Sequence, residues 1–298
     1  MRIGTSLHAL TDFGNDVKPF RQALAEAAEC GFETVMLMNF PGQPPVTAGE
    51  GPACCLVDLE ASDPEVVRQT VAAAGLVPAF VYQACTNVAD EEAAAQSGRA
   101  MRNLAALARK LGASIIIPNA GIAPAPLMPV SEKEELLQRV ARAAMSALEG
   151  APAETRVAFD IHYGAAIESV ADCERLFELA LDPRVGIALN IGHMTTCHQE
   201  GWHLLRDHLD RVHVVAWKDH LLNPPPEATH PVYSVELGTG DSPFERYAEA
   251  LKGNESAVEH LITFEHVPLA EKKEALRRSL QCLRRLLGQA ERRTRVTI

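Results

Sequence analysis

The sequence is poor in aromatic residues and has no paired cysteine motif. Aromatics make up 5% of the 298 residues, and the seven cysteines include no CxxC spacing, which excludes a zinc ribbon or a redox pair. No stretch approaches the ~20 consecutive apolar residues of a membrane span, and the first ten residues lack the apolar core of a signal peptide. We therefore expect a reduced, cytoplasmic protein that does not enter a membrane.

An excess of positive charge is also missing. The chain has 28 Lys and Arg against 39 Asp and Glu, a net charge of −11. Proteins that bind nucleic acid or anionic lipid normally carry a net positive charge, so we expect neither partner. Hydrophobic residues at 47% are ample for a packed core, which excludes disorder as the main state.

Short apolar runs alternate with longer amphipathic ones along the whole chain. The expected strands cover 2–7, 33–39, 76–82, 113–119, 156–162, 185–191, 211–219 and 260–266. The expected helices cover 17–31, 63–74, 88–111, 131–148, 169–181, 199–208, 243–252 and 270–288. Eight strands that each precede a helix indicate parallel βαβ units.

This repeat predicts a (β/α)8 TIM barrel that forms a single domain over residues 1–298. No linker or change of composition divides the chain. The alternative is an open doubly wound sheet, which would usually carry a glycine-rich phosphate turn after its first strand. Residues 8–15 lack that fingerprint, so we expect no nucleotide cofactor.

Polar side chains follow almost every predicted strand, where a barrel of this kind places its active site. They are His8, Asn39, Tyr82, Gln83, Asn119, Asp160, His162, Asn190, His193, Lys218, Asp219, His220, Glu265 and His266. Several of these, such as His8 and Asn119, are equally typical of ordinary loop or capping residues. Twelve or more polar groups would nevertheless meet at one rim.

Asp160 and Glu265 are the strongest candidates for chemistry. Both lie in apolar runs that should be buried, and a buried carboxylate is costly unless it is paired, protonated or bound to metal. Burial and like charge would raise a carboxylate pKa toward the range of a general base.

Four phrases in order resemble the xylose isomerase-like barrel superfamily, which includes sugar phosphate isomerases, ketose 3-epimerases, hydroxypyruvate isomerase, inosose dehydratase and endonuclease IV. They are 190–193 (NIGH), 211–219 (RVHVVAWKD), 238–244 (GTGDSPF) and 262–265 (ITFE). The resemblance covers residues 2–287 and is strongest over 156–266. Such barrels often form dimers or tetramers, so it implies a homodimer or a homotetramer.

The resemblance implies a divalent cation held by Glu, Asp, His and Glu of strands five to eight. Here Asp160, Asn190 and Ala216 replace the first three ligands, and only Glu265 matches in type. The implied ligands are therefore Asp160, Asn190 and Glu265, around Mg²⁺, Mn²⁺ or Zn²⁺. With one negative charge and the imidazole lost, we expect the site to be weakened, and a metal-free enzyme remains an alternative.

The resemblance also implies residues that bind substrate. His193 matches a histidine that commonly contacts substrate in the family. Lys218 would polarise a carbonyl or bind an anionic group, or else form an ion pair with Asp219. Trp217 would stack on a sugar ring or pack in the core. We expect His162, His8 and Asn119 to complete the rim, under long loops at 40–58, 119–130 and 221–237.

The implied activity is that of an isomerase or epimerase, or secondarily a dehydratase, acting on a small sugar or keto-polyol. Glu265 would abstract a proton next to a carbonyl to form an enediolate, and Asp160 would be its acid/base partner. The altered ligand positions leave an alternative, a catalytically inactive barrel that serves as a partner subunit or small-molecule binder. The negative net charge and lost ligands argue against a DNA-repair nuclease.

Overall fold

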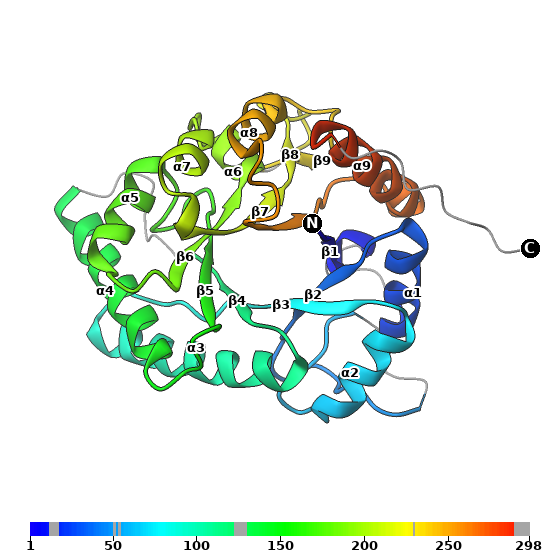
Figure 1. Cartoon of the computed structure of the whole chain (residues 1–298), viewed down its shortest axis with the longest axis horizontal. Coiled ribbons are helices and arrows are strands. Elements are labelled where there is room, and N and C mark those ends of the chain that lie inside the picture. Colours follow the sequence, from blue (N-terminus) through cyan, green and yellow to red (C-terminus); the bar gives the residue numbers. More distant parts are fainter. Residues whose placement is uncertain (12–17, 50–51, 53–54, 122–129, 229, 289–298) are drawn as a thin grey trace, which may run out of the picture.

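The computed structural model describes the chain except for residues 12–17, 50–51, 53–54, 122–129, 229 and 289–298, and it forms a closed barrel (Figure 1). The barrel strands are β1 (Ile3–Ser6), β2 (Thr34–Met38), β3 (Val77–Gln83), β4 (Ile115–Pro118), β5 (Arg156–Asp160), β6 (Val185–Asn190), β7 (Val212–Trp217) and β10 (Glu259–Ile262). Neighbours pair in parallel in sequence order, and β1 closes the ring against β10. The predicted (β/α)8 barrel is confirmed.

The strands form because apolar residues occupy both of their faces. Every residue of β2, β6 and β7 is buried. One apolar cluster fills the space between strands and helices, and a second fills the barrel interior. The interior cluster includes the small residues Ala158, Ala188 and Ala216. Small side chains inside a closed barrel leave room for a cavity above them.

Helices surround the barrel (Figure 1). They are α1 (Phe20–Cys30), α2 (Pro64–Ala73), α3 (Glu91–Leu111), α4 (Val130–Leu148), α5 (Val170–Leu179), α6 (Ile191–Thr196), α7 (Trp202–Asp207), α8 (Phe244–Leu251) and α9 (Lys272–Leu286). Local chemistry sets their starts: Asp63 caps α2 ahead of a proline, and Ser169 with Asp172 forms a capping box on α5. None of the helices in the described ranges combines the length and apolar character that a bilayer crossing requires.

Three features near the barrel mouth differ from the sequence prediction. The short helix α6 follows β6 directly, and the strand expected over 211–219 is divided after Trp217. Beyond that point β8 (Asp219–His220) leaves the barrel and pairs antiparallel with β9 (Ser234–Val235). The last barrel strand also ends at Ile262, so Glu265 lies in the loop beyond it rather than inside the strand. This ribbon and loop place the charged residues described next.

Candidate active site

A cavity of about 240 Å³ opens at the carboxyl ends of the barrel strands. It is lined by His8, Met36, Met38, Phe40, Tyr82, Ala84, Ile117, Asp160, His162, Ala188, Asn190, Ala216, Lys218, Leu261, Thr263 and Glu265. Because parallel strands end on the same face, residues far apart in sequence meet there. Asp160 and Glu265 share this cavity, as the sequence predicted.

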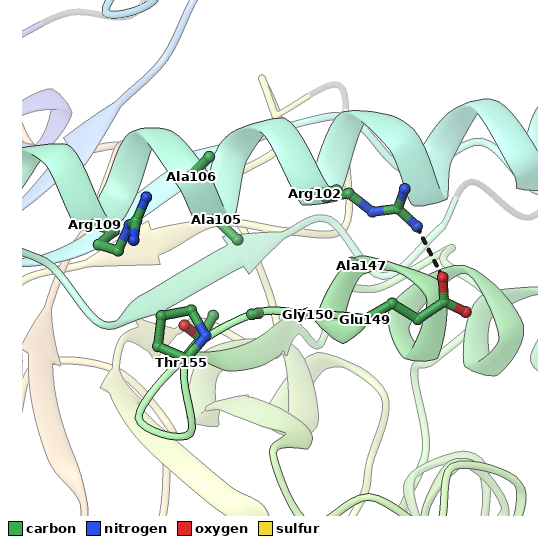
Figure 2. Close-up of a pocket in the computed structure, with 10 residues that line it drawn as sticks. Arg102, Ala105, Ala106, Arg109, Ala147, Glu149, Gly150 and Thr155 are labelled. Atoms are coloured by element: carbon green, nitrogen blue, oxygen red, sulfur yellow. Dashed lines mark hydrogen bonds and ion pairs between the residues drawn. The ribbon is translucent and has the colours of Figure 1, made fainter.

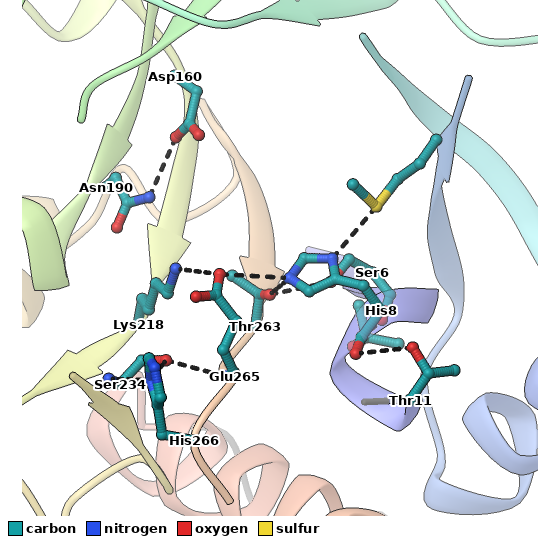
Figure 3. A network of polar contacts seen from close by, with 12 residues as sticks. Ser6, His8, Thr11, Asp160, Asn190, Lys218, Ser234, Thr263, Glu265 and His266 are labelled. Atoms are coloured by element: carbon teal, nitrogen blue, oxygen red, sulfur yellow. Dashed lines mark hydrogen bonds and ion pairs between the residues drawn. The ribbon is translucent and has the colours of Figure 1, made fainter. Parts of the chain in front are cut away.

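Lys218 and Glu265 form an ion pair in the cavity wall (Figure 3). Lys218 Nζ donates to Glu265 Oε1 at 2.7 Å, and the lysine side chain is 5% exposed while the glutamate is 38% exposed. The β8–β9 ribbon holds the glutamate in place, since the backbone N–H of Glu265 donates to Ser234 Oγ at 2.8 Å. Lys218 therefore pairs across the cavity wall and not with its neighbour Asp219.

Asp219 instead bonds the backbone of the loop that follows β9. Its carboxylate accepts backbone N–H bonds from Gly238 and Gly240, each at 2.8 Å, and from Ser242 at 3.1 Å. A Cβ at Gly240 would lie 2.5 Å from Asp219 Oδ1, so this approach requires glycine. These bonds fix the segment that follows Lys218 and so the direction from which its ammonium enters the cavity.

The two cavity carboxyl groups differ in their proton affinity. The Lys218 ammonium holds the pKa of Glu265 far below its usual range. Burial raises the pKa of Asp160 above its ordinary value of 3.8, although His162 and Asn190 act in the opposite direction. The expectation that burial would raise a carboxylate pKa is confirmed for Asp160 and wrong for Glu265, because the lysine was not foreseen as its partner.

Asp160 is paired with an amide rather than with a charge. Asn190 Nδ2 donates to Asp160 Oδ1 at 3.1 Å, from the end of the neighbouring strand β6 (Figure 3). The amide oxygen Oδ1 of Asn190 is buried without a hydrogen-bond partner among the described residues. An amide leaves the aspartate able to take up a proton, which a cationic partner would oppose.

His8 lies on the other side of Glu265. Its Nε2 is 2.9 Å from Thr263 Oγ1 and 3.8 Å from Glu265 Oε1, and its Nδ1 is 3.2 Å from the sulfur of Met38 (Figure 3). Burial lowers the pKa of His8 to about 4, so the ring is neutral at pH 7. The structure places His8 at the cavity, where the sequence predicted it.

His193 does not line the cavity. It is fully buried behind His162, with the two ring centroids 3.7 Å apart, and burial holds its pKa well below the usual value. The backbone N–H of Tyr163 donates to His193 Nδ1 at 3.2 Å, and its Nε2 has no partner among the described residues. The expected contact of His193 with substrate therefore cannot form in this conformation, whereas the exposed His162 does reach the cavity.

Asn119 and Trp217, which were expected to contact substrate, also lie outside the cavity. Asn119 bonds the backbone N–H and carbonyl of Thr86, at 2.8 and 3.1 Å, and so fixes the loop after β3. Trp217 is fully buried, and its Nε1 donates to His260 Nδ1 at 3.0 Å. Alternation along β7 turns Ala216 toward the cavity and Trp217 toward the helices. Stacking of Trp217 on a sugar ring is excluded by this placement.

The expected metal ligands do not fit a resident divalent ion. Glu265 Oε1 accepts from an ammonium, and the group that Asn190 turns toward Asp160 is an N–H donor. In the described part of the chain, no three His, Cys, Asp or Glu side chains are grouped so as to hold a metal ion. The Lys218 ammonium beside Glu265 would repel a cation there.

A second hollow, of about 230 Å³, lies near the opposite end of the barrel between α3 and α4 (Figure 2). Its polar wall is the ion pair of Arg102 with Glu149 at 3.3 Å, and Arg102 also donates to the carbonyl of Ser146. The carboxylate is 74% exposed. The hollow lacks the buried acid–base groups of the mouth cavity, which remains the candidate site.

Sequence reasoning missed the apolar part of the site. Met36, Met38, Phe40, Ile117 and Leu261 line the cavity beside the charged groups. The period-two pattern marks Met36 and Met38 as facing the same side of β2, but only barrel closure shows that this side is the interior. Of the three long loops, the one at 40–58 supplies Phe40, and most of the one at 119–130 lies outside the described residues.

The chain belongs to the xylose isomerase-like TIM barrel family, whose model matches residues 24–286. A comparison with curated proteins finds no match. The barrel geometry and the order of the strand-end motifs agree with this assignment.

Solved structures with the same fold are distant in sequence. L-ribulose 3-epimerase is 16% identical, with a TM-score of 0.70 over 96% of this chain and 94% of that one. The IOLI protein with a bound zinc atom is 11% identical, with a TM-score of 0.73 over 97% and 98%. The probable 3-DHS dehydratase AsbF from Bacillus anthracis is 14% identical, with a TM-score of 0.69 over 95% and 98%. At these identities the likeness shows the fold alone.

Proposed function

We propose that the protein is an isomerase or epimerase that moves a proton at the carbon next to the carbonyl of a small hydroxy ketone. One observation carries this proposal: a single cavity at the barrel mouth holds a carboxyl group of raised pKa, Asp160, and a buried ammonium group, Lys218. The first binds a proton more tightly than an ordinary carboxylate does, and the second is suited to stabilise an oxyanion.

In this mechanism the Asp160 carboxylate removes the proton from the carbon next to the carbonyl. The electron pair of the broken C–H bond forms the new C=C bond, and the carbonyl π electrons move to oxygen. Lys218 donates to that oxygen and stabilises the enediolate. An ammonium has three N–H donors, and Glu265 takes one of them. When Asp160 returns its proton to the former carbonyl carbon, and the hydroxyl proton of the enediolate passes to the former carbonyl oxygen, the product is the isomer. When a proton from solvent reaches the opposite face of the original carbon and the carbonyl re-forms, the product is the epimer.

In the proposal Glu265 orients Lys218 through their ion pair. The proton-abstracting role assigned to Glu265 from the sequence thus passes to Asp160, because a strongly stabilised carboxylate is a weak base.

The proposal needs no divalent metal, because Lys218 supplies the positive charge. Some proteins of this fold hold one, and the IOLI protein with its bound zinc atom is an example. Metal analysis of the purified protein, before and after chelation, tests this part. Full activity after chelation supports it, and activity that disappears and returns with added metal contradicts it.

Deuterium exchange tests the chemistry directly. In D₂O, NMR should show exchange of the hydrogen next to the carbonyl in at least one member of a hydroxy-ketone and ketose panel, at a rate that Asp160→Asn abolishes. Absence of exchange for every compound would favour the second candidate, a barrel that binds a small molecule without reacting. That candidate is favoured by the substitutions at Asn190 and Ala216.

A further inference from the structure

The carboxyl-terminal face of the barrel has very few basic residues. Its connecting segments are 7–19, 39–63, 84–90, 119–129, 161–169, 191–201, 218–243 and 263–271. Together they contain two Lys, no Arg and fifteen Asp or Glu. Among the described residues of these segments the count is two Lys, no Arg and twelve Asp or Glu.

Both lysines of this face already have acidic partners. Lys218 Nζ lies 2.7 Å from Glu265, and Lys18 Nζ lies 2.7 Å from Glu26. The next lysine along, Lys272 at the start of α9, is buried and donates to the backbone carbonyl of Thr11. A phosphate brings about two negative charges and needs several unpaired donors, usually from Arg or Lys. An acidic face without such a cluster repels phosphorylated substrates.

Charged and apolar residues also occupy different walls of the cavity, because they come from different groups of adjacent strands. Strands β5, β6, β7 and β10, or the residues just beyond them, contribute the polar residues Asp160, His162, Asn190, Lys218, Thr263 and Glu265, and also Ala188, Ala216 and Leu261. Strands β2, β3 and β4, or the residues just beyond them, contribute Met36, Met38, Phe40, Tyr82, Ala84 and Ile117. Because each set comes from adjacent strands, the charged groups lie on one wall and the other wall is almost wholly apolar.

A fully hydroxylated sugar matches only half of such a cavity. Hydroxyl groups turned toward the β2–β4 wall would lose their bonds to water and find few partners, since the phenol of Tyr82 is the polar group on that side. A hydrocarbon group on the same carbon skeleton would instead be removed from water by Met36, Phe40 and Ile117. The division therefore selects for an amphipathic molecule.

We propose that the substrate of this site is a neutral α-hydroxy ketone that carries a hydrocarbon group, rather than a phosphorylated or fully hydroxylated sugar. Its carbonyl and hydroxyl oxygens lie against Asp160 and Lys218, and its hydrocarbon part lies against the β2–β4 wall. This inference rests on the proposed function for the reaction, but the binding preference can be measured without any turnover.

Calorimetric titration of the full chain with three probes tests the preference. The probes are 2-hydroxyacetophenone, D-fructose and dihydroxyacetone phosphate: a neutral hydroxy ketone with an apolar group, a neutral polyol and an anion. We expect 2-hydroxyacetophenone to bind at least about tenfold more tightly than the other two. Equal or tighter binding of either other probe, or no binding of 2-hydroxyacetophenone up to its solubility limit, overturns the inference.

A matched pair of variants tests whether the apolar β2–β4 wall contributes to binding of 2-hydroxyacetophenone. Phe40 is only partly buried, so Phe40→Asn should leave the barrel folded, and we expect it to weaken binding of 2-hydroxyacetophenone about fivefold or more. Leu222→Asn changes a residue that is 41% exposed and lies outside the cavity, so binding should be unchanged. Equal affinities in Phe40→Asn and the wild type would show that the apolar wall does not contribute to binding.

Deuterium exchange separates this inference from the proposed function. Tight binding of 2-hydroxyacetophenone without exchange at its CH₂ group upholds the binding preference and contradicts the reaction. Exchange with D-fructose or dihydroxyacetone phosphate, combined with tighter binding of that compound, upholds the reaction and contradicts the preference.

Discussion

The Nζ atom of Lys218 lies 2.7 Å from Oε1 of Glu265, although the two residues are 47 positions apart in the chain. The pair forms where β7 and the loop beyond β10 meet at the barrel mouth. It gives the site a buried positive charge bound to Glu265, a carboxylate that the resemblance implied as a metal ligand. The lysine therefore distinguishes this cavity from the site predicted from the sequence.

Lys218→Met should lower the rate of proton exchange by about 10²–10³, because the enediolate oxygen loses its charged donor. Methionine keeps most of the length of the unbranched side chain, so the variant should remain folded. The matched control is Lys18→Met, which breaks an ion pair of the same 2.7 Å length outside the cavity. Exchange in Lys218→Met that equals exchange in the control would remove Lys218 from the mechanism.

Asp160→Asn should abolish exchange and at the same time stabilise the protein at pH 7. Folding raises the pKa of this carboxyl group above 3.8, so the folded state binds the proton more tightly than the unfolded state. The free energy of unfolding of the wild type therefore falls as pH rises from 3.8 through the raised pKa. The asparagine of the variant does not titrate, so the variant does not lose this stability. Thermal melts of the wild type and the variant at pH 4 and pH 7 measure the difference in stability between them.

The same pKa predicts the pH profile of the wild type. The carboxylate must be ionised to accept a proton, so kcat/KM should rise with pH through a single acid limb above 3.8. The Glu265 pKa is depressed and adds no limb in that range. A profile that is flat from pH 4 to pH 8 would contradict the assignment of Asp160 as the base.

Glu265→Gln should destabilise the protein with the opposite pH dependence. Folding depresses the pKa of Glu265 below 4.5, so its contribution to stability is present above that pH and is lost as pH falls through the folded-state value. The difference in melting temperature between wild type and variant should be largest near pH 7 and shrink below pH 4.5. Glu149→Gln, at a side chain 74% exposed, should show almost no difference at any pH.

Asn190→Asp with Ala216→His should create a metal site. Both positions line the cavity, and the double variant restores the two ligand types that the resemblance implied for strands six and seven. We expect Zn²⁺ or Mn²⁺ to raise the melting temperature of the double variant but not that of Ala216→Ser. Binding of equal strength in the wild type would show that the site already fits a metal ion.

Gly192→Ala should destabilise the region behind the cavity by about 1–3 kcal/mol through overpacking. An added Cβ would lie 2.4 Å from Cδ2 of His220, a ring that is fully buried. Gly49→Ala is the control, since nothing lies within 4 Å of its added Cβ. Urea unfolding gives both free energies, and equal values would mean that the His220 ring moves aside freely.

Prediction from the sequence succeeded where a local pattern determines the outcome. Alternating apolar strands and amphipathic helices specify a (β/α)8 barrel, and a barrel places strand-end residues such as Asp160, Asn190 and Lys218 on one face. The alternation of side chains along a strand also predicts the direction of Trp217. If Ala216 faces the cavity, its neighbour Trp217 must face the helices.

The sequence by itself thus determined the fold and the face of the barrel on which each charged group lies, because both follow from periodicity and local order. Only the tertiary structure decided that Lys218 pairs with Glu265, that His193 is covered by His162, and that β2–β4 form an apolar wall. These relationships join residues far apart in the chain, and they depend on barrel closure and on the direction of each side chain. No local pattern encodes such distances.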